Sequence, residues 1–595
     1  MPPRASPTSA LRLRRFYTSR AAVDTPPPVS HSRGAPNGSS ASLPPKRKQR
    51  STWTQRLLVL GLIGGGVYAY DKKFNASAIT RSLRTGYIGL LCTLDYKLNF
   101  SPEKANEINE LHERVAKRLR WVIDTNQGLY LKLGQAIGLQ AALLPKPYRD
   151  AFFHVFDNAP SVPYEQVVQV FRSDLGIDPM DVFGEFSKEA LASASVAQVH
   201  RAVLRPEAGN PDQVVAVKVQ KPAIAKQMEW DLFSYKSLMW LAQKAFDLPL
   251  YFVADYVSSQ MRFETSFTME AANARKCAAL LAQTPELRDD VYVPRIYGKE
   301  DGYPESDRIL VMEWVDGCRL NDKKQIEAWG LDPREVMDLA IGLNGAMTFS
   351  WGFVHCDPHP GNILVRPHPW KKGKPQIVVL DHGLYITLRQ SFREEYATLW
   401  RSMFVLDIDT IEKIGKKWGL GLDPNMFASA IMLRPTQVKP TGKKGPHPKK
   451  SEYELQLEVK AQFKAILESE QLIPKELIFL TRCQRMMQAN NQTLGSPSSR
   501  VNVTAQWAAR GYANSLTGSR ALSAVGFQTW LKDRLQMVVF RFTLWVIDVA
   551  FWWTKLKQRW GSSDALGWED RLQKQMESLA RDEFGIEIDD TVFLG

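Results

Sequence analysis

The sequence predicts an α+β fold of two lobes, because two strand patterns stand among long helical stretches. Residues 214–219 alternate as a half-buried strand does, with three valines on one face and Lys218 on the other. The apolar run 377–380 ends at an Asp and a Gly-containing turn, as a buried strand does. Helical patterns occupy residues 73–160 and return at 452–493.

Two short segments carry the strongest chemical signal. Asp357 and Asn362 stand five residues apart within His-Cys-Asp-Pro-His-Pro-Gly-Asn, and Asp381 follows Asp357 by 24 residues. The same Asp-to-Asn spacing occurs in the catalytic loop of kinases. There, one Asp lies beside the nucleophile, while an Asn and a second Asp hold Mg²⁺ on the phosphates of ATP. We therefore expect Asp357 at the position of the catalytic base, with Asn362 and Asp381 as metal ligands.

The rest of a kinase-like site should lie upstream of these segments. Lys218 occupies the place of the strand lysine that holds the α- and β-phosphates, although a surface lysine on an edge strand is the plainer alternative. Its helical partner should be Glu270. Residues 308–315 predict the strand that enters the adenine-binding hinge, which makes Glu313 a candidate nucleotide contact.

Several parts of a protein kinase are absent from the sequence. No Gly-rich GxGxxG loop precedes Lys218. Because alanine adopts positive φ less readily than glycine, the segment in that place should be stiffer and should approach phosphates differently. It consists of Ala192, Ser193, Ala194, Ser195, Val196 and Ala197. Cys356 replaces the arginine that clamps a phosphorylated activation loop, and no Ala-Pro-Glu follows Asp381.

Over residues 100–500 the chain resembles the UbiB/aarF-domain atypical kinase-like family, and in particular its aarF-domain-containing kinase one branch. The KxGQ hallmark of that family matches Lys132 and Gln135, and its Ala-rich loop matches 192–197. Lys132 and Gln135 are three residues apart, so they project from one helical face. A packed helix whose lysine reaches water is the alternative. In the family, the KxGQ helix folds over the active site, so the resemblance adds these two residues to the nucleotide site.

The ExD…E segment of the family matches Glu264, Ser266 and Glu270, with Ser266 in place of the Asp. What the resemblance implies is a two-lobed protein-kinase-like fold with a helical N-terminal KxGQ extension and added C-terminal helices. It also implies ATP or ADP with Mg²⁺, and an atypical kinase or ATPase acting on a small-molecule or lipid substrate. The implied setting is mitochondrial lipid or coenzyme Q homeostasis.

A second class of function stays open, namely a pseudokinase-like scaffold that binds nucleotide to regulate mitochondrial lipid transport or assembly. Retention of Lys218, Asp357, Asn362 and Asp381 together favours catalysis, because a scaffold has no chemical need for all four. Nucleic acid is not expected as a partner. Of the net charge of +14, the first 50 residues supply +9, through ten basic residues against one acid. Five scattered cysteines without CxxC spacing argue against a disulfide framework or a zinc site.

Residues 1–50 predict a mitochondrial presequence, since they are rich in Arg, Ser and Pro and nearly free of acids. A disordered basic arm is the alternative. Residues 53–70 follow as an uncharged stretch broken only by Arg56, with aromatic residues near both ends, so we expect a transmembrane helix in the mitochondrial inner membrane. A buried hydrophobic hairpin is the alternative. Gly61 and Gly65 have GxxxG spacing, which would permit two copies to pair as a homodimer.

The patterns divide the remainder of the chain into regions. A segment rich in Pro, Gly and Lys should be a loop, and an aromatic-rich tail should form an amphipathic helix on the bilayer or on the kinase core. The expected regions are the KxGQ extension at 100–160, the small lobe at 161–330, the large lobe at 331–520, the loop at 436–450 and the tail at 525–595.

Overall fold

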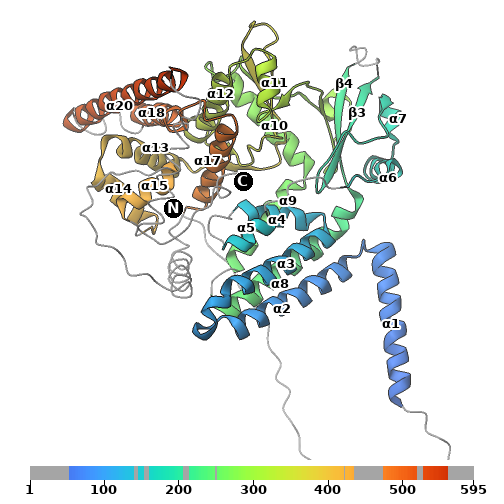
Figure 1. The fold of residues 1–595 in the computed structure, drawn as a ribbon. Helices are drawn as coiled ribbons and strands as arrows, with labels where there is room; N and C mark the ends of the chain where they lie inside the picture. The colour runs from blue at the N-terminus through green and yellow to red at the C-terminus, as the bar shows by residue number, and fades with distance from the viewer. Residues whose placement is uncertain are drawn as a thin grey trace, which may run out of the picture. The chain divides into compact units, whose positions relative to one another are not determined.

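An antiparallel sheet around Lys218 forms the small lobe, on the right of Figure 1. The computed structural model describes residues 52–139, 145–152, 160–205, 213–247, 251–420, 423–433, 474–518 and 527–560. The strand order is β1-β3-β4-β7-β6, with β2 paired to β3. These strands are β1 (Phe183–Phe186), β2 (Ala192–Ser193), β3 (Ala197–Leu204), β4 (Val214–Gln220), β6 (Ile296–Tyr297) and β7 (Ile309–Glu313).

One face of this sheet is buried beneath helix α6 (Tyr164–Leu175), which is followed by the short helix α7 (Pro179–Val182). Val215, Val217 and Val219 of β4 are at most 1% exposed and pack against residues of α6. Because side chains alternate along a strand, Lys218 projects from the opposite face. The strand pattern predicted at 214–219 is confirmed.

The large lobe combines two small sheets with helices. The first sheet has the order β5-β11-β10-β8, and the second pairs β12 with β9. The strands are β5 (Val291–Tyr292), β8 (Cys318–Arg319), β9 (Phe353–His355), β10 (Ile363–Pro367), β11 (Pro375–Val379) and β12 (Tyr385–Thr387). The helices are α11 (Lys323–Ala328), α12 (Pro333–Gly345), the π-helical turn η6 (Ala346–Trp351), α13 (Gln390–Val405), α14 (Ile408–Lys417), α15 (Pro424–Met432), α17 (Lys475–Thr493) and α18 (Arg500–Gly518). The α+β, kinase-like fold class is therefore confirmed.

Strand register in the large lobe gathers the two chemical segments. β10 and β11 pair antiparallel with Ile363 opposite Val379, so the chain at Asn362 and the chain at Leu380 leave the sheet together. The Leu380 amide donates to the Asn362 carbonyl at 2.8 Å. β9 pairs with β12, which sets His355 opposite Tyr385. The segments around 357 and 381 therefore meet at one end of these sheets.

A helical layer joins two stretches of the chain that are far apart in sequence. Helix α2 (Ala78–Asn99) packs against α3 and α8, and Figure 1 shows the three helices side by side. Arg81 of α2 forms a buried ion pair with Asp231 of α8 at 2.5 Å. Helix α8, within the region expected as the small lobe, thus packs on the N-terminal helices. The other members are η1 (Pro102–Glu107), α3 (Ile108–Asn126), α4 (Leu129–Leu139), α5 (Lys146–Phe152), α8 (Pro222–Phe246) and α9 (Tyr251–Glu264).

Helix α1 (Thr52–Phe74) contains the stretch that was expected to cross the membrane. Within the described part of the chain, no helix has the length and apolar character that a membrane span requires. The expectation of a transmembrane helix at 53–70 was therefore wrong. Its apolar run extends only from Leu57 to Tyr70, and four of those residues are glycines, which contribute little hydropathy.

The aromatic tail forms the long helix α20 (Phe527–Trp560). Met537, Phe540 and Leu544 are buried in the core of the large lobe, so this helix lies on the kinase core. Its opposite face exposes apolar side chains, among them Phe542 and Trp545. The expected presequence at 1–50, the loop at 436–450 and the end of the tail beyond residue 560 lie outside the described residues.

Candidate active site

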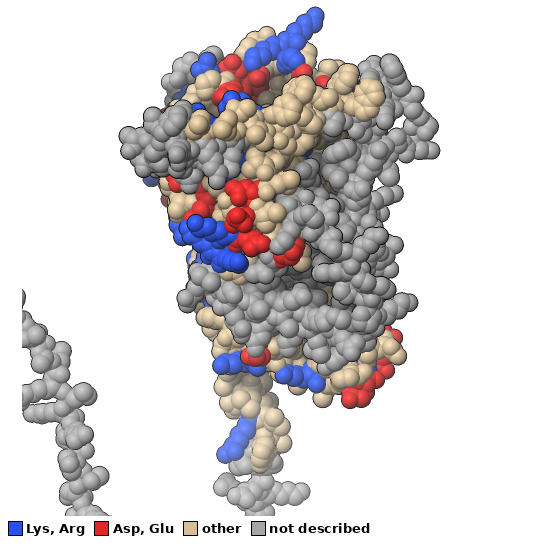
Figure 2. Space-filling model, turned by 90° about the vertical axis from the view of Figure 1, so that its left-hand side faces the viewer, with Lys and Arg blue, Asp and Glu red and all other residues tan. Residues whose placement is uncertain are grey.

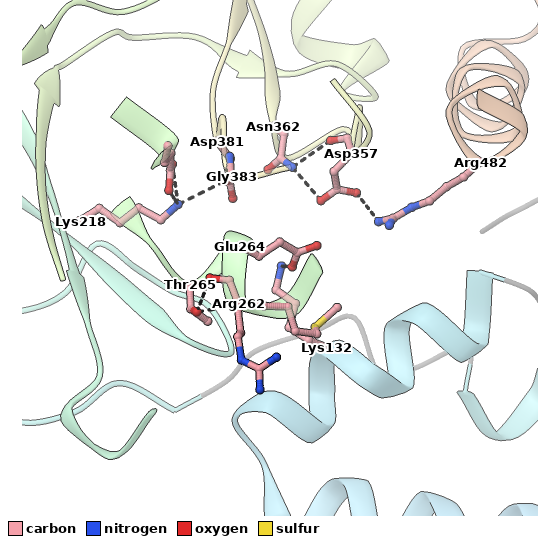
Figure 3. A network of polar contacts seen from close by, with 12 residues as sticks. Lys132, Lys218, Arg262, Glu264, Thr265, Asp357, Asn362, Asp381, Gly383 and Arg482 are labelled. Carbon is pink, nitrogen blue, oxygen red and sulfur yellow. Dashed lines mark hydrogen bonds and ion pairs between the residues drawn. The ribbon is translucent and has the colours of Figure 1, made fainter. Parts of the chain in front are cut away.

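Lys218 lies between two carboxylates. Its Nζ atom is 2.8 and 2.9 Å from the two Glu270 oxygens and 3.2 Å from Oδ1 of Asp381 (Figure 3). Glu270 is supplied by helix α10 (Phe267–Ala282), which packs against β7 and β6 of the small-lobe sheet. The structure thus brings together the predicted lysine, its predicted helical partner and the predicted metal ligand.

The charges of these three groups do not balance, because one ammonium group faces two carboxylates. Burial would lower the pKa of Lys218, but Asp381 and Glu270 raise it above its ordinary value. Burial raises the pKa of Glu270 to about 7, and the nearby charge of Asp381 adds to this effect despite the Lys218 contact. The site therefore has excess negative charge when Glu270 is ionised, which favours a bound cation.

Asp381 adopts an uncommon backbone conformation, with φ of 48°. Few residues other than glycine adopt positive φ, and such conformations often occur at functional sites. His355 helps to hold this turn, because its Nε2 lies 3.0 Å from the Asp381 carbonyl. The Nδ1 atom of the same ring accepts the Asp357 amide at 3.1 Å, so His355 links both chemical segments. Its pKa is lowered by burial, which keeps the ring neutral.

Asp357 and Asn362 are in direct contact. The Asn362 side-chain amide donates to the Asp357 carbonyl at 3.0 Å and to its carboxylate at 3.2 Å. Among the hydrogen bonds of the described residues, Oδ1 of Asn362 accepts none, so this oxygen is available to a cation. Burial raises the pKa of Asp357, but the Arg482 and Lys132 cations lower it below the ordinary value.

Arg482 was missed from the sequence. It lies on α17, and its Nη2 atom donates to Oδ1 of Asp357 at 2.9 Å (Figure 3). The segment around Arg482 carries no local signal, since the residue is one of several basic residues on an ordinary helix. Only the tertiary packing of α17 against the catalytic segment places it there, as the Asn490 contact with the Pro358 carbonyl also shows.

Lys132 reaches the same site from the KxGQ helix α4. Its Nζ lies 3.4 Å from Oε2 of Glu264, the end residue of α9. Glu264 raises the pKa of Lys132, against the effect of burial, and Asp357 and Asp381 act in the same direction. The predicted Lys132 is thus in the site, whereas the side chain of Gln135 lies outside the described residues.

The Ala-rich segment forms a hairpin where protein kinases have a flexible Gly-rich loop. Ala192 and Ser193 pair with β3, and the Ala194 amide donates to the Ala197 carbonyl at 2.8 Å. The hairpin is also fixed by Lys221, which sequence reasoning missed and whose Nζ donates to the Ala194 carbonyl at 2.6 Å. Within the described residues the buried Oγ atom of Ser193 has no hydrogen-bond partner. Of the remaining predicted residues of the segment, Ser195, Val196 and Ala197 are buried.

Two other candidate positions have their side chains engaged elsewhere. Oε2 of Glu313 accepts from the Tyr292 hydroxyl at 2.6 Å and from the Arg295 amide at 3.1 Å, so a nucleotide contact there would come from the backbone. Ser266 is the N-cap of α10, and its Oγ donates to Asp307 at 2.8 Å. Ser266 therefore acts in helix capping.

The donor set fits Mg²⁺ bound together with nucleotide phosphates. Mg²⁺ prefers hard oxygen ligands and usually takes one or two carboxylates plus substrate phosphates. Asp381 and Asn362 offer such oxygens side by side. Among the described residues, no cluster of three or more His, Cys, Asp or Glu forms a metal site. The residues of the chain would therefore hold the ion only in part, with the phosphates completing its coordination.

A two-lobed fold with a Lys–Glu pair and an Asp–Asn catalytic segment defines an atypical kinase-like protein. The model of the ABC1 atypical kinase-like domain matches residues 154–415. The chain is 42% identical to the ABC1 family protein C10F6.14c of Schizosaccharomyces pombe, over 76% of this chain and 83% of that protein. It is 33% identical to the ABC1 family protein lscO of Purpureocillium lilacinum, over 91% of this chain and 95% of that protein. It is 31% identical to AarF domain-containing protein kinase 1 of Gallus gallus, over 76% of this chain and 86% of that protein. The chain belongs to the ABC1 family of atypical kinase-like proteins.

Proposed function

We propose that this chain binds ATP or ADP with Mg²⁺ and acts as an atypical kinase or ATPase on a small-molecule or lipid acceptor. The observation that carries the proposal is the convergence of Lys218, Glu270 and Asp381 beside the contacting pair Asp357 and Asn362. Bound Mg²⁺ would neutralise the phosphates. Lys218 would hold the α- and β-phosphates, and Asp357 would orient the acceptor hydroxyl or water.

The buried hydroxyl of Ser193 and the negative charge of the site both support this proposal. A phosphate oxygen would give the Ser193 hydroxyl a partner, and Mg²⁺ would offset the second carboxylate beside Lys218. The test is turnover of ATP by the purified full chain with Mg²⁺, with Asp357→Asn as the matched inactive variant. Turnover that is equal in both proteins would contradict the assignment of Asp357.

A second candidate function is a nucleotide-binding scaffold. The observation that favours it is that both Asp357 oxygens are already engaged, one by Arg482 at 2.9 Å and the other by Asn362 at 3.2 Å. A carboxylate held in this way is a poor base. If the chain is a scaffold in this state, it will bind MgATP without turnover. An Arg482→Met variant that gains turnover would then identify Arg482 as the restraint.

We further propose that the protein acts at a mitochondrial membrane, in lipid or coenzyme Q homeostasis. Support comes from the basic N-terminal segment and from the exposed apolar face of α20. Figure 2 faces the side on which α20 lies in Figure 1, and a band of uncharged surface crosses its upper part. The acceptor of phosphoryl transfer would come from that membrane. Import into isolated mitochondria, with and without residues 1–50, tests the location.

Membrane contact through α20 can be tested separately. Trp552 and Trp553 are 56% and 54% exposed, so their replacement by Ser should not disturb the core. We expect the full chain to float with vesicles of mitochondrial lipid and the double variant to remain unbound. Equal flotation of both proteins would exclude this face as the membrane contact.

A further inference from the structure

A second cavity lies beside the candidate active site and is separated from it by Gly383. Its volume is about 870 Å³. Its walls come from the end of α9, the exposed side of α10, the segment from Gly383 to Arg389 and the start of α17. A Cβ atom added to Gly383 would lie 3.2 Å from Oδ1 of Asp381 and 4.0 Å from Oε2 of Glu270. The cavity therefore lies directly behind the Lys218 carboxylate cluster.

The walls of this cavity are apolar and cationic. Aromatic and aliphatic side chains line much of it, including Phe263, Met269 and Phe353. Three cationic residues, Lys276, Arg389 and Lys475, line the cavity, and Glu476 is the only acidic one among its described lining residues. Arg389 neutralises Glu476 at 2.7 Å. Lys276 adds positive charge to the walls beyond this pair.

Lys276 is the cation best placed to receive a ligand. It is exposed, and its Nζ lies 3.9 Å from the centroid of the Phe353 ring. Within the described residues no acidic side chain forms an ion pair with it. An ammonium held over an aromatic ring by a cation–π contact can still donate its protons to an anion. Lys276 and Phe353 together present a charge and an apolar surface at one point.

The short connection after β12 explains why this space is open. In protein kinases an activation loop follows the metal-binding Asp, and its phosphate is bound by basic side chains. Here only Leu388 and Arg389 connect β12 to α13, so this connection is too short to cover the cavity as an activation loop would. Cys356 stands where the phosphate-clamping arginine would be, and it is fully buried. The connection after β12 therefore supplies no phosphorylated side chain to the basic residues of the cavity.

We propose that this cavity binds a small amphiphilic anion, in which a phosphate or carboxylate is attached to an apolar chain. Lys276 would receive the anionic group, and the apolar body would lie on Phe263, Met269 and Phe353. Such a ligand regulates the neighbouring nucleotide site and is not the acceptor of phosphoryl transfer, because Gly383 separates the cavity from that site.

The elements that line the cavity also carry the groups of the candidate active site. Glu270 is on α10, Asp381 immediately precedes the lining segment, and Arg482 is on α17. The Asn273 amide, which is on a cavity wall, donates to the His382 carbonyl at 3.0 Å and so ties α10 to the segment after Asp381. A ligand that fixes these walls would change how Glu270 and Asp381 hold Lys218. This coupling rests on nucleotide binding at that site, whereas ligand binding in the cavity does not.

The test uses the full chain and octyl phosphate below its critical micelle concentration. Octanol, which lacks the phosphate group, and inorganic phosphate, which lacks the apolar chain, are the comparison ligands. By calorimetry we expect octyl phosphate to bind at least tenfold more tightly than either comparison ligand. Lys276→Met should weaken it at least fivefold, while Lys324→Met, on an exposed lysine of α11, should leave it unchanged. Equal binding to the Lys276 variant, or equal binding of octanol, would overturn the proposal.

Two further measurements separate this site from the nucleotide site. Saturating MgADP should leave octyl phosphate bound, and displacement by MgADP would place the ligand at the phosphate site and overturn the proposal. Octyl phosphate should shift the affinity for MgADP by at least twofold in the wild-type chain and not in the Lys276 variant. An unchanged MgADP affinity would refute the coupling. Failure of MgADP to bind at all would instead contradict the proposed function, and the calorimetry of octyl phosphate would still decide the cavity.

Discussion

Replacing Asp381 by Asn should separate metal binding from folding. The substitution removes one negative charge from the pair of oxygen ligands that Asp381 and Asn362 present, and a neutral amide is a poorer ligand for a hard dication. Loss of groups that merely support a metal ligand costs 10–100-fold in affinity. We therefore expect Mg²⁺-dependent nucleotide affinity to fall at least tenfold, or about 1.4 kcal/mol.

The fold should survive this change. The Asp381 side chain is 39% exposed, so loss of its 3.2 Å contact with Lys218 should cost less than about 1 kcal/mol after solvent screening. Lys218 keeps both contacts to Glu270, and removal of the Asp381 charge relieves its repulsion of Glu270. Asn also tolerates the φ of 48°, whereas Ala at this position should cost about 1 kcal/mol more.

The assay is calorimetric titration with ADP, in Mg²⁺ and in EDTA, together with urea unfolding of each protein. Asp124→Asn, on an exposed residue of α3, is the matched control for the loss of a carboxylate. We expect the control to bind as the wild-type chain does in both conditions. A folded Asp381→Asn protein whose Mg²⁺-dependent affinity equals that of the control would refute the metal assignment.

Three other substitutions test the surrounding groups. Because the pKa of Glu270 is raised to about 7 from 4.5, its ionisation destabilises the folded chain as the pH rises between these values. Urea unfolding should therefore show the wild-type chain losing up to about 3 kcal/mol relative to Glu270→Gln across that window, and parallel pH profiles would contradict this. Ala194→Gly should change the ratio of ATP to ADP affinity, measured by calorimetry, because the hairpin becomes more flexible. If glycine substitutions at 192, 194 and 197 all left both nucleotide affinities unchanged, the segment would not be the phosphate cover. Arg482→Met should lower the free energy of unfolding by about 2 kcal/mol, because the charged Asp357 loses its partner, and unaltered stability would show that the ion pair contributes nothing.

The parts of the site that could be predicted are those encoded by local patterns. Lys218 follows from strand alternation, and Asp357, Asn362 and Asp381 follow from their spacing. The antiparallel pairing of β10 with β11 then brings Asn362 and the residue before Asp381 to the same end of the sheet. The structure places all four close together. Glu270 could be chosen because it matches the last Glu of the family's ExD…E segment, and Ser266 of the same segment is the N-cap of its helix.

The parts that could not be predicted depend on packing between distant elements. Arg482 is 125 residues from Asp357 along the chain, and nothing in its own segment distinguishes it from the neighbouring basic residues. Lys221 lies directly after a predicted strand, but its bond to the Ala194 carbonyl requires the hairpin of β2 and β3 to fold over it. The contact of α8 with α2 could not be predicted either, because nothing in the sequence indicates that Asp231 pairs with Arg81.

The two halves of the site differ in their electrostatics. In the first half, Lys218 contacts two carboxylates, those of Glu270 and Asp381, so its single positive charge does not balance their two negative charges. Lys132, which matches the KxGQ hallmark, and Arg482, which only the structure reveals, supply positive charge to the other half of the site through their contacts with Glu264 and Asp357. They come from α4 and α17, which are separate from the sheets that hold the catalytic segments. Movement of either helix would therefore change the charge of the site while leaving its catalytic framework in place.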